Sequence, residues 1–400
     1  MDIKERFLKY VSFHTSSDEE SVSCPSTARQ LALAEYLADE LKSIGLHDAC
    51  FTEKGYVYAH LASNCGSDET IGFIAHMDTS PSAPGDNVRP RSFIYEGGDI
   101  ELGGGVVTAV KDFPFLSDYK NKELIVTDGT TLLGADDKAG VAEIMSAVEY
   151  LVNHPEIKRK NVSVAFTPDE EVGRGTESFD IEKFGAKAAY TVDGGALGEI
   201  EYECFNASSA KITVKGVNIH PGSAKNKMKN AVLMAADFVS RLPAAETPAH
   251  TEGYEGFYHL CEMSGDESSA VIKLIIRDHS REKFENRKEF IRNLTHFMNS
   301  VYGECFSAEI KDSYYNMREL IEQGSMWLVE DAENAMKTAG VSPKIVAIRG
   351  GTDGAMLTYK GLPCPNLSTG GENFHGVHEF VCVNDMKKMV EVILNLCENN

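Results

Sequence analysis

The spacing of apolar residues in much of the chain predicts helices that alternate with buried strands. Leu31, Leu37 and Leu41 recur at helical intervals and Gly45 follows as a stop signal, so we expect a helix over residues 27–44. A second helical pattern covers residues 138–152. Short apolar runs indicate strands that are buried on both faces, and they are residues 71–76, 131–135, 162–166, 188–192 and 344–348. This alternation predicts βαβ units and a mostly parallel sheet.

The pattern changes between residues 207 and 316. Strand-like KITVKGV precedes a helical pattern at 228–242, which is followed by strand patterns near 257–263 and 270–277, a helix through Phe284 and Ile291, and a strand near 305–311. This βαββαβ order is typical of a small split-βαβ sandwich. We therefore expect a discontinuous larger domain over 1–206 and 317–400, with a smaller domain at 207–316 inserted in it. Residues 80–122 fit neither pattern and are expected to form hairpins and loops.

The composition of the chain limits which binding partners we expect and which cellular compartment the protein occupies. The formal net charge of −22, from 61 acidic and 39 basic side chains, argues against nucleic acid and anionic membranes as partners. The nine cysteines are odd in number and form no CxxC pair, which predicts a reducing compartment. The N-terminal segment is charged and no stretch reaches the apolar length of a membrane span. We expect a cytoplasmic protein.

Polar residues of one chemical type follow the apolar runs of the larger domain. The segments are HMDT (76–79), GADDKAG (134–140), TPDEEVG (167–173), TVDGG (191–195) and HGVHEF (375–380). Open α/β sheets collect their ligands at the carboxyl edge of the strands. Because the segments offer imidazole and carboxylate groups, they suit zinc, cobalt or manganese. A shared carboxylate would allow two ions roughly 3.5–4 Å apart, as in two-metal hydrolases.

Each segment by itself also has an ordinary structural explanation. GADD can cap the helix that begins near residue 138, DEE can be a solvated loop, and TVDGG can be a turn. At the end of its strand, His76 lies on the same side of the pleat as Asp78, which can orient the imidazole. The spacing leaves open which member is the ligand in three pairs: Asp136 and Asp137, Glu170 and Glu171, and His375 and His378.

Over essentially its whole length the chain resembles the zinc-dependent peptidase family M20. HMDT, GADD and DEE are shared widely in that family, and VAFTPDEEVG, YTVDGG, IRGGTDGA and PCPNLSTGG extend the similarity. TEGYEGFYHL (251–260) and DSYYNMRE (312–319) are similar specifically to the tripeptide aminopeptidases of subfamily M20B. The resemblance implies an α/β catalytic domain of phosphorylase/hydrolase-like type and an inserted ferredoxin-like lid or dimerisation domain, through which such chains pair as homodimers.

The resemblance also implies a site with two zinc ions, for which cobalt or manganese can substitute. It assigns the general base to Glu170 and the support of the first histidine to Asp78, and it implies a non-proline cis peptide after Asp136. The implied metal ligands are His76, Asp136 as the bridge, Glu171, Asp193 and His378. The implied substrate-binding residues are His220 and Arg277 of the smaller domain, with Asn230 and Arg349 as further candidates, although His220 can equally be a turn residue and Arg277 part of a surface ion pair.

The activity implied by the resemblance is removal of the N-terminal residue of tripeptides. Glu170 would take a proton from the attacking water and return it to the leaving amine, with the smaller domain closing over the peptide. One alternative is another M20-type amidohydrolase, either a dipeptidase or an N-acyl amino acid deacylase. A second alternative is a peptide-binding protein without turnover, which would lack the base or a ligand. None of these residues is missing from the sequence.

Overall fold

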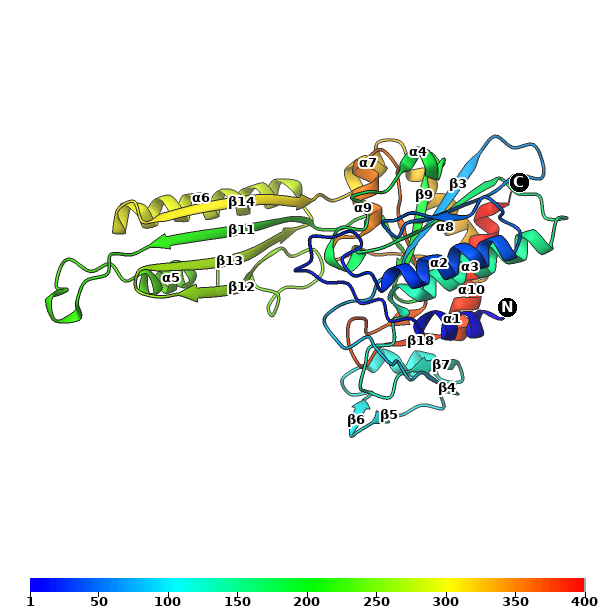
Figure 1. Ribbon diagram of the computed structural model, residues 1–400, viewed down its shortest axis with the longest axis horizontal. Coiled ribbons are helices and arrows are strands. Elements are labelled where there is room, and N and C mark those ends of the chain that lie inside the picture. The colour runs from blue at the N-terminus through cyan, green and yellow to red at the C-terminus, as the bar shows by residue number, and fades with distance from the viewer. Residues whose placement is uncertain (399–400) are drawn as a thin grey trace. The chain divides into compact units, whose positions relative to one another are not determined.

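The computed structural model describes residues 1–398 and divides the chain into two compact units (Figure 1). The first unit consists of Met1–Tyr202, Leu320–Val346 and the chain from Thr352 onward. The second consists of Glu203–Glu319 and the short segment Ala347–Gly351. The sequence had placed the smaller domain at 207–316, so the compact unit extends a few residues further at each end and takes up a returning segment.

An eight-stranded sheet forms the centre of the first unit, in the order β1-β2-β8-β3-β9-β16-β10-β15. Strand β3 pairs in parallel with β8 and β9, and β9 pairs in parallel with β16. Antiparallel strands β1 and β2 lie at one edge. The predicted mostly parallel centre is therefore confirmed. The strands are β1 (Cys50–Phe51), β2 (Val57–Leu61), β3 (Thr70–His76), β8 (Asn161–Thr167), β9 (Ala189–Gly194), β10 (Glu199–Glu201), β15 (Lys344–Ile345) and β16 (Asn366–Ser368).

Helices flank this sheet, as the alternating pattern predicts. The helices expected at 27–44 and 138–152 are present as α2 (Gln30–Ser43) and α3 (Ala135–Asn153), and α3 packs against β3 and β9. Within residues 1–398, no helix is both long and apolar enough to cross a bilayer. The remaining helices of this part of the chain are α1 (Ile3–Val11), α4 (Ile181–Phe184), α7 (Arg318–Glu322), α8 (Met326–Thr338), α9 (Asp353–Tyr359), α10 (Val383–Cys397), η1 (Pro114–Tyr119) and η2 (Glu170–Val172).

A separate four-stranded sheet, in the order β17-β18-β7-β4, was not foreseen from the sequence. Its central pair joins distant parts of the chain, because Phe380 in β18 lies opposite Val126 in β7. The hairpin expected within residues 80–122 is formed by β5 and β6. The strands are β4 (Arg91–Ile94), β5 (Ile100–Gly103), β6 (Val106–Thr108), β7 (Glu123–Val126), β17 (Gly371–Glu372) and β18 (Phe380–Cys382).

Two of the predicted strands are wrong in whole or in part. Residues 131–135 form a loop into α3, because the amides of Leu133 and Gly134 donate to the carboxylate of Glu379 and do not pair with a strand. Gly134 has a φ of +81°, which ends any extended run there. The run at 344–348 is a strand only at Lys344–Ile345, since the chain then enters the second unit.

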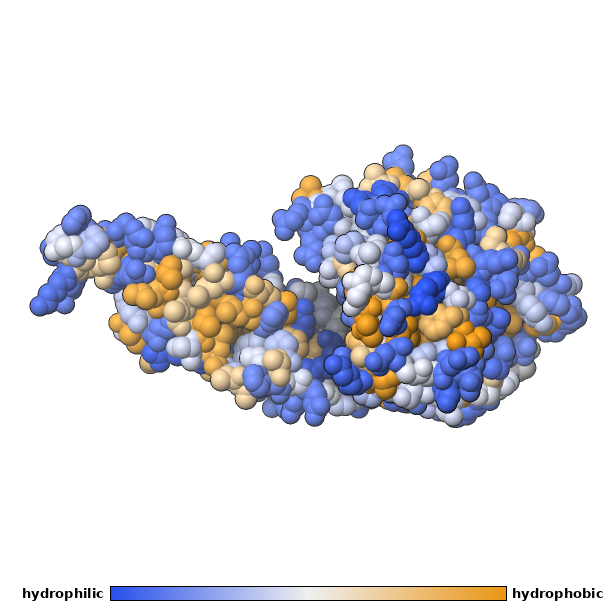
Figure 2. Space-filling model, turned by 90° about the horizontal axis from the view of Figure 1, so that it is seen from below, coloured by the Kyte–Doolittle hydropathy of each residue, from blue (hydrophilic) through white to orange (hydrophobic). Residues whose placement is uncertain are grey.

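The second unit has the predicted βαββαβ order. Its strands form an antiparallel sheet, β12-β13-β11-β14, and α5 and α6 pack on it around a core that includes Ile212, Phe238, Ile272, Phe284 and Ile291. Figure 2 shows apolar side chains exposed on this unit. Leu260 and Met263 of β12 are among the exposed large apolar residues of the chain. The elements are β11 (Asn206–Lys215), η3 (Pro221–Ser223), α5 (Ala231–Ser240), β12 (Phe257–Gly265), β13 (Ser269–Asp278), α6 (Arg281–Tyr302) and β14 (Phe306–Tyr314).

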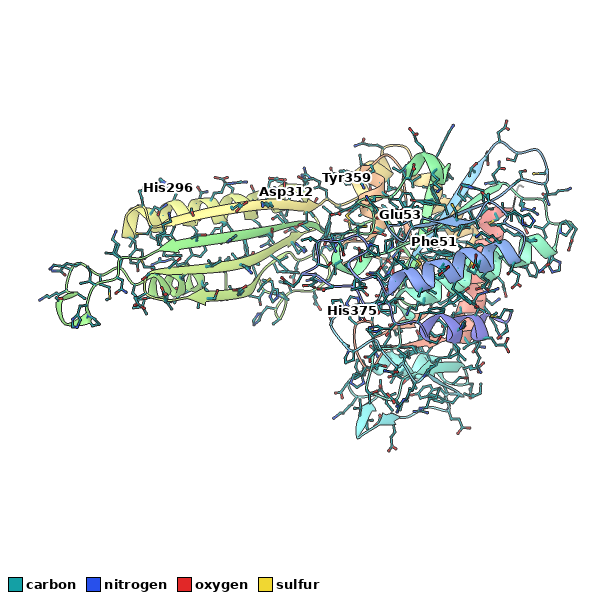
Figure 3. All side chains as sticks on the ribbon, viewed as in Figure 1. Phe51, Glu53, His296, Asp312, Tyr359 and His375 are labelled. Carbon is teal, nitrogen blue, oxygen red and sulfur yellow. The ribbon has the colours of Figure 1, made fainter. Side chains whose placement is uncertain are left out.

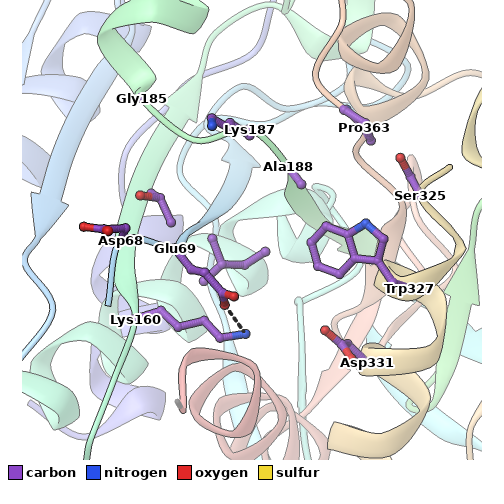
Figure 4. A pocket seen from close by; sticks show the side chains of 12 residues that line it. Asp68, Glu69, Lys160, Gly185, Lys187, Ala188, Ser325, Trp327, Asp331 and Pro363 are labelled. Carbon is purple, nitrogen blue, oxygen red and sulfur yellow. Dashed lines mark ion pairs between the residues drawn. The ribbon is translucent and has the colours of Figure 1, made fainter. Parts of the chain in front are cut away.

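A hollow of about 730 Å³ opens at the amino ends of β3, β8 and β9 in the first unit (Figure 4). Its lining includes Trp327 and the ion pair between Lys160 and Glu69, whose nitrogen and oxygen are 3.4 Å apart. Three of the imidazole and carboxylate segments, at residues 76–79, 167–173 and 191–195, lie at the carboxyl ends of the same strands. The predicted chemistry therefore belongs to the opposite edge of the sheet.

Glu143 of α3 makes the stability of the first unit depend on pH. Its side chain is fully buried, and neither carboxylate oxygen has a hydrogen-bond partner among the described residues. Burial, followed by repulsion from Asp385, raises the pKa of Glu143 well above its usual range. A carboxyl group whose pKa is higher in the folded than in the unfolded chain favours folding fully below the unfolded pKa, and this contribution is lost as pH rises through the folded value.

We therefore expect Glu143→Gln to unfold at a higher urea concentration than the unchanged protein at neutral and mildly alkaline pH. The difference in unfolding free energy should start to grow above a pH of about 4.3, the ordinary pKa of glutamate. Urea unfolding at a series of pH values measures it. A difference that stays constant with pH would show that Glu143 does not bind a proton on folding.

Candidate metal centre

The fold brings the predicted histidine and carboxylates together at the carboxyl edge of the main sheet. His76 ends β3, Glu171 lies in η2 after β8, Asp193 lies near the end of β9, and Asp136 stands at the start of α3. The ligand atoms of His76, Asp136 and Glu171 all lie within 4.8 Å of one another. His76 Nε2 is 2.8 Å from Asp136 Oδ1 and 3.3 Å from Asp193 Oδ1. These groups can converge on a shared cation.

The two neighbouring aspartates have different surroundings. The peptide bond between Asp136 and Asp137 is cis, as the family resemblance implies. Asp137 accepts hydrogen bonds from the backbone amides of His76 (3.1 Å) and Gly140 (3.2 Å). Asp136 instead has one oxygen beside His76 and the other 3.1 Å from His375 Nε2. A carboxylate between two imidazoles is suited to bridge two ions, whereas Asp137 is engaged with the backbone.

The two candidate histidines of the last segment have different surroundings. His375 Nε2 lies 3.1 Å from Asp136 Oδ2 and 3.0 Å from Glu171 Oε2. The imidazole of His378 has its Nδ1 2.9 Å from the hydroxyl of Thr108, and its ring packs on Phe113 with centroids 5.3 Å apart. The structure therefore brings His375 to the carboxylates, and the metal-ligand role expected for His378 stays a prediction. His375, labelled in Figure 3, has a φ of +64°, so the loop turns its side chain independently of strand periodicity.

Asp78 connects the first histidine with the two glutamates. Its side chain is fully buried, and Oδ1 lies 3.4 Å from His76 Nδ1. The same oxygen accepts the backbone amide of Glu170 at 3.0 Å, and Oδ2 accepts that of Glu171 at 3.2 Å. His76 Nδ1 also lies 3.1 Å from the backbone oxygen of Asp78, so this residue contacts both the imidazole and the glutamate loop, and its supporting role in catalysis stays a prediction.

The electrostatics of the cluster are those of a site that needs cations. Burial, opposed in part by His76, raises the pKa of Asp193 to about 7. Burial also raises the pKa of Glu171, and the carboxylate of Asp136 adds to this effect. Burial lowers the pKa of His76, but the carboxylates of Asp193 and Asp136 outweigh it and hold this pKa well above its usual range. Divalent ions would offset this buried negative charge.

The donor set also fits two divalent ions in number and type. Glu171 Oε1 is buried and has no hydrogen-bond partner within residues 1–398, so this oxygen is available as a ligand. The ligand atoms of His76, Asp136 and Glu171 lie within 4.8 Å of one another, and so do those of His76, Asp137 and Asp193. In addition, His76 lies beside Asp136 and Asp193, and His375 lies beside Asp136 and Glu171. Imidazole and carboxylate donors of this kind suit zinc, cobalt and manganese.

Asp169 supports the glutamate loop and was not singled out from the sequence. It has a φ of +58° and is fully buried, and its carboxylate accepts the amide and the hydroxyl of Ser26 and the side-chain amide of Gln30. The loop that carries Glu170 is thereby tied to the N-terminal end of α2. The only signal in the sequence was the acidic residue that begins DEE.

Asp353 is a second buried carboxylate near this site. Its Oδ2 accepts the hydroxyl of Thr167 at 2.8 Å, whereas its Oδ1 has no partner among the described residues. Burial raises the pKa of Asp353 to about 7. The sequence marks it only as part of IRGGTDGA, because its closeness to Thr167 depends on the packing of α9 against the sheet.

Two of the predicted substrate-binding residues have local roles in the second unit. His220 precedes the short helix η3, and its Nδ1 accepts the amide of Gly222 at 3.2 Å. Asn230 caps α5, because its side-chain oxygen accepts the amide of Leu233 at 3.1 Å. These contacts account for both residues structurally, and their role in substrate binding stays a prediction.

The two predicted arginines also have partners within the second unit. Arg277 donates to the carbonyl oxygen of Ser208, and its guanidinium lies 5.4 Å from the ring centroid of Tyr314. Arg349 donates to the loop at residues 251–255 and lies over the ring of Phe205 at 5.0 Å. These contacts account for the position of Arg277 without an ion pair. Its contact with a peptide carboxylate stays a prediction.

The sequence and the fold are similar to those of known peptidases. Peptidase T of Caldanaerobacter subterraneus subsp. tengcongensis is 53% identical over 401 residues, which cover 99% of this chain and 98% of that protein. Peptidase T of Clostridium perfringens (strain SM101) is 54% identical over 397 residues, which cover 98% of each. In both cases the similarity extends over nearly the whole of each chain.

Solved structures support the fold. An aminopeptidase from Bacillus cereus ATCC 10987 superposes with a TM-score of 0.77 at 22% identity, covering 99% of this chain and 97% of that chain. A tripeptidase from Staphylococcus aureus subsp. aureus Mu50 gives a TM-score of 0.79 at 19% identity, covering 99% and 96%. The sequence pattern of peptidase family M20/M25/M40 matches residues 113–399. The chain therefore belongs to the peptidase family M20/M25/M40.

Proposed function

We propose that this protein is a two-metal aminopeptidase that releases the N-terminal residue of tripeptides. The observation that carries the proposal is the position of Asp136 between His76 and His375, with Glu171 and Asp193 beside it. Whole-chain identity of 53–54% to proteins named peptidase T favours this activity over other reactions of the family.

The proposed ligands form two groups that share one carboxylate. His76, Asp136 and Asp193 would hold one ion, and Asp136, Glu171 and His375 the other, with His375 taking the place of the predicted His378. We propose zinc as the metal, with cobalt or manganese as substitutes, because the donors are nitrogen and oxygen only. Two such ions would polarise the scissile carbonyl and make the attacking water more acidic.

The chain's own residues supply the proton transfers. Glu170 would accept the proton of the attacking water and return it to the leaving amine. Burial is the largest cause of a pKa of Glu170 well above its usual range, which favours a carboxylate that takes up a proton during the reaction. Asp78 would keep this base in place through the amide of Glu170, while the same carboxylate orients His76.

A matched substrate series tests the proposed activity. A tripeptide, the dipeptide that lacks its last residue, the same tripeptide with an acetylated amine, and an N-acetyl amino acid are incubated with metal-loaded protein, and the products are identified by mass spectrometry. We expect the free tripeptide to release its first residue fastest and the acetylated tripeptide to resist. Preferred cleavage of the dipeptide, or turnover of acylated substrates only, would support the alternative amidohydrolase activities and contradict ours.

A binding measurement on the same preparation distinguishes an enzyme from a peptide-binding protein. If metal-loaded protein binds the tripeptide, measured by calorimetry, but forms no product, then the binding alternative holds. Removal of metal by a chelator should abolish hydrolysis, and its restoration by added zinc serves as the control. Hydrolysis that persists without metal would refute the two-metal proposal.

We further propose a cytoplasmic homodimer that pairs through the second unit. The nine cysteines are odd in number and form no CxxC pair, which supports a reducing compartment. Strands β12 and β14 are the edges of the second sheet, and β12 exposes Leu260 and Met263. An exposed apolar edge strand is suited to pair with a second copy. Light scattering on the purified protein checks this, and a mass of 43.8 kDa would indicate a monomer.

A further inference from the structure

Glu379 is a buried carboxylate that joins two loops of the metal centre. It stands immediately before β18, on the loop that carries His375, and its side chain is about 1% exposed. Its Oε2 accepts the backbone amides of Leu133 at 2.6 Å and Gly134 at 2.8 Å, and its Oε1 accepts the amide of Asp136 at 3.0 Å. One side chain thus binds three amides of the loop that presents the proposed bridging ligand.

The loop that receives these hydrogen bonds is not paired in a sheet, although Leu132 donates to the carbonyl of Pro84 and Thr131 accepts from the hydroxyl of Thr127. Residues 131–134 belong to no strand, and Gly134 has a left-handed φ of +81° directly before α3. Backbone amides at the start of a helix carry partial positive charge and favour a carboxylate partner. Without this carboxylate, three buried amides would lose an acceptor, at a cost that usually forces a loop to rearrange.

Glu379 itself is held firmly at the other end. Its amide donates to the carbonyl of Gly376 at 3.2 Å, and the next residue, Phe380, is paired with Val126 of β7. The turn from residue 376 to 379 therefore fixes Glu379 relative to His375. A displacement of the loop at 133–136 would change the distance between Asp136 and His375, which is now 3.1 Å.

From this geometry we propose that Glu379 is a positioning residue that sets Asp136 against His375. The inference rests on the two-metal function proposed above, since it assigns Glu379 the task of holding the bridging carboxylate where both ligand groups can use it. Glu379 contacts the backbone of a ligand and not the ligand side chains, so its effect is exerted through Asp136.

The chemistry explains why the residue must be a carboxylate. Glutamine has the same shape but offers a single acceptor oxygen, and its amide nitrogen would face a backbone N–H. If the amide oxygen of glutamine still accepts the backbone amides of Leu133 and Gly134, then the hydrogen bond from the amide of Asp136 is lost. Aspartate keeps both acceptor oxygens but is one methylene shorter, so it can reach the loop only in part. The two substitutions therefore test acceptor number and reach separately.

The experiment compares metal binding in Glu379→Gln, Glu379→Asp and the unchanged protein. Zinc stoichiometry and affinity are measured by competition with a chelator, and the unfolding temperature of the metal-free proteins is recorded in parallel. We expect Glu379→Gln to bind zinc about 10- to 100-fold more weakly, the usual effect of losing a residue that supports a ligand, and Glu379→Asp to lie between.

Glu40→Gln provides a matched control. Glu40 is a partly buried carboxylate of the first unit, with a side chain about 8% exposed, and it accepts hydrogen bonds from Arg6 at 2.9 Å and Tyr10 at 2.8 Å. Its substitution removes a buried charge and should lower the unfolding temperature, but it should leave zinc affinity unchanged. A purely structural role of Glu379 would give the same result as this control.

The outcomes separate this inference from the proposed function. Unchanged protein that binds no zinc would refute the metal centre itself. Unchanged protein that binds two ions, with Glu379→Gln binding them as tightly as Glu40→Gln does, would refute the positioning role whatever the unfolding temperature. Should Glu379→Gln not fold, the affinity of Glu379→Asp decides, and a value equal to that of the unchanged protein overturns the proposal.

Discussion

Glu170→Gln should lower kcat for tripeptide hydrolysis by about 10²- to 10⁴-fold, the usual contribution of a general acid–base group, while the metal content stays unchanged. The reason is that a neutral amide has almost the same shape as a carboxylate but cannot take up the proton of the attacking water. Steady-state kinetics with a tripeptide and elemental analysis of the same preparations measure the two quantities.

Glu171→Gln serves as the matched comparison for this substitution. The two glutamates are neighbours, and the amides of both donate to Asp78, but it is the carboxylate of Glu171 that lies 3.0 Å from His375. We therefore expect Glu171→Gln to lose metal as well as activity. Turnover that survives in Glu170→Gln would remove Glu170 from the role of base, and metal loss in both variants would mean that both side chains are ligands.

His375→Ala should weaken the binding of one of two metal ions by more than the roughly 10- to 100-fold that loss of a supporting residue costs, because it removes a ligand. Activity should fall with it at ordinary metal concentrations. His378→Ala should retain both ions, since its imidazole is engaged with Thr108 and Phe113. Zinc titration of the two purified variants gives the stoichiometry and affinity of each.

The two histidines are natural controls for each other, because they are three residues apart in one loop. The unfolding temperature of the metal-free variants shows whether either substitution disturbs the fold. If His378→Ala loses an ion and His375→Ala keeps both, then the assignment by family resemblance was correct and the ligand group described here is wrong.

The central strands and helices of the first unit and the main elements of the second could be predicted from local pattern. The uniformly apolar runs in β3, β8 and β9 specify strands covered on both faces, and the helical spacing in α2 and α3 specifies the helices that cover them. In the second unit, the alternation along β11 and β13 sets the register of an antiparallel sheet. Such signals are local, because each depends on which face of one element is buried.

The failures of prediction have a common physical cause. Residues 131–135 have the apolar character of a strand, yet Leu133 and Gly134 donate to Glu379, which lies far away in the sequence. Likewise β7 and β18 become neighbours only when the chain returns to the same sheet. Hydrogen bonds to distant side chains leave no periodic signal along the chain.

By itself, the sequence determined the class of fold, the two-part organisation, and a set of histidine and carboxylate side chains at the ends of the main strands. Only the tertiary structure decided which partners each of these side chains contacts. It turned Asp136 toward two imidazoles and Asp137 toward backbone amides, and it brought His375 to Glu171 while His378 packed against Phe113. The physical reason is that a ligand's identity depends on direction and distance, and in irregular loops these are set by long-range hydrogen bonds and packing.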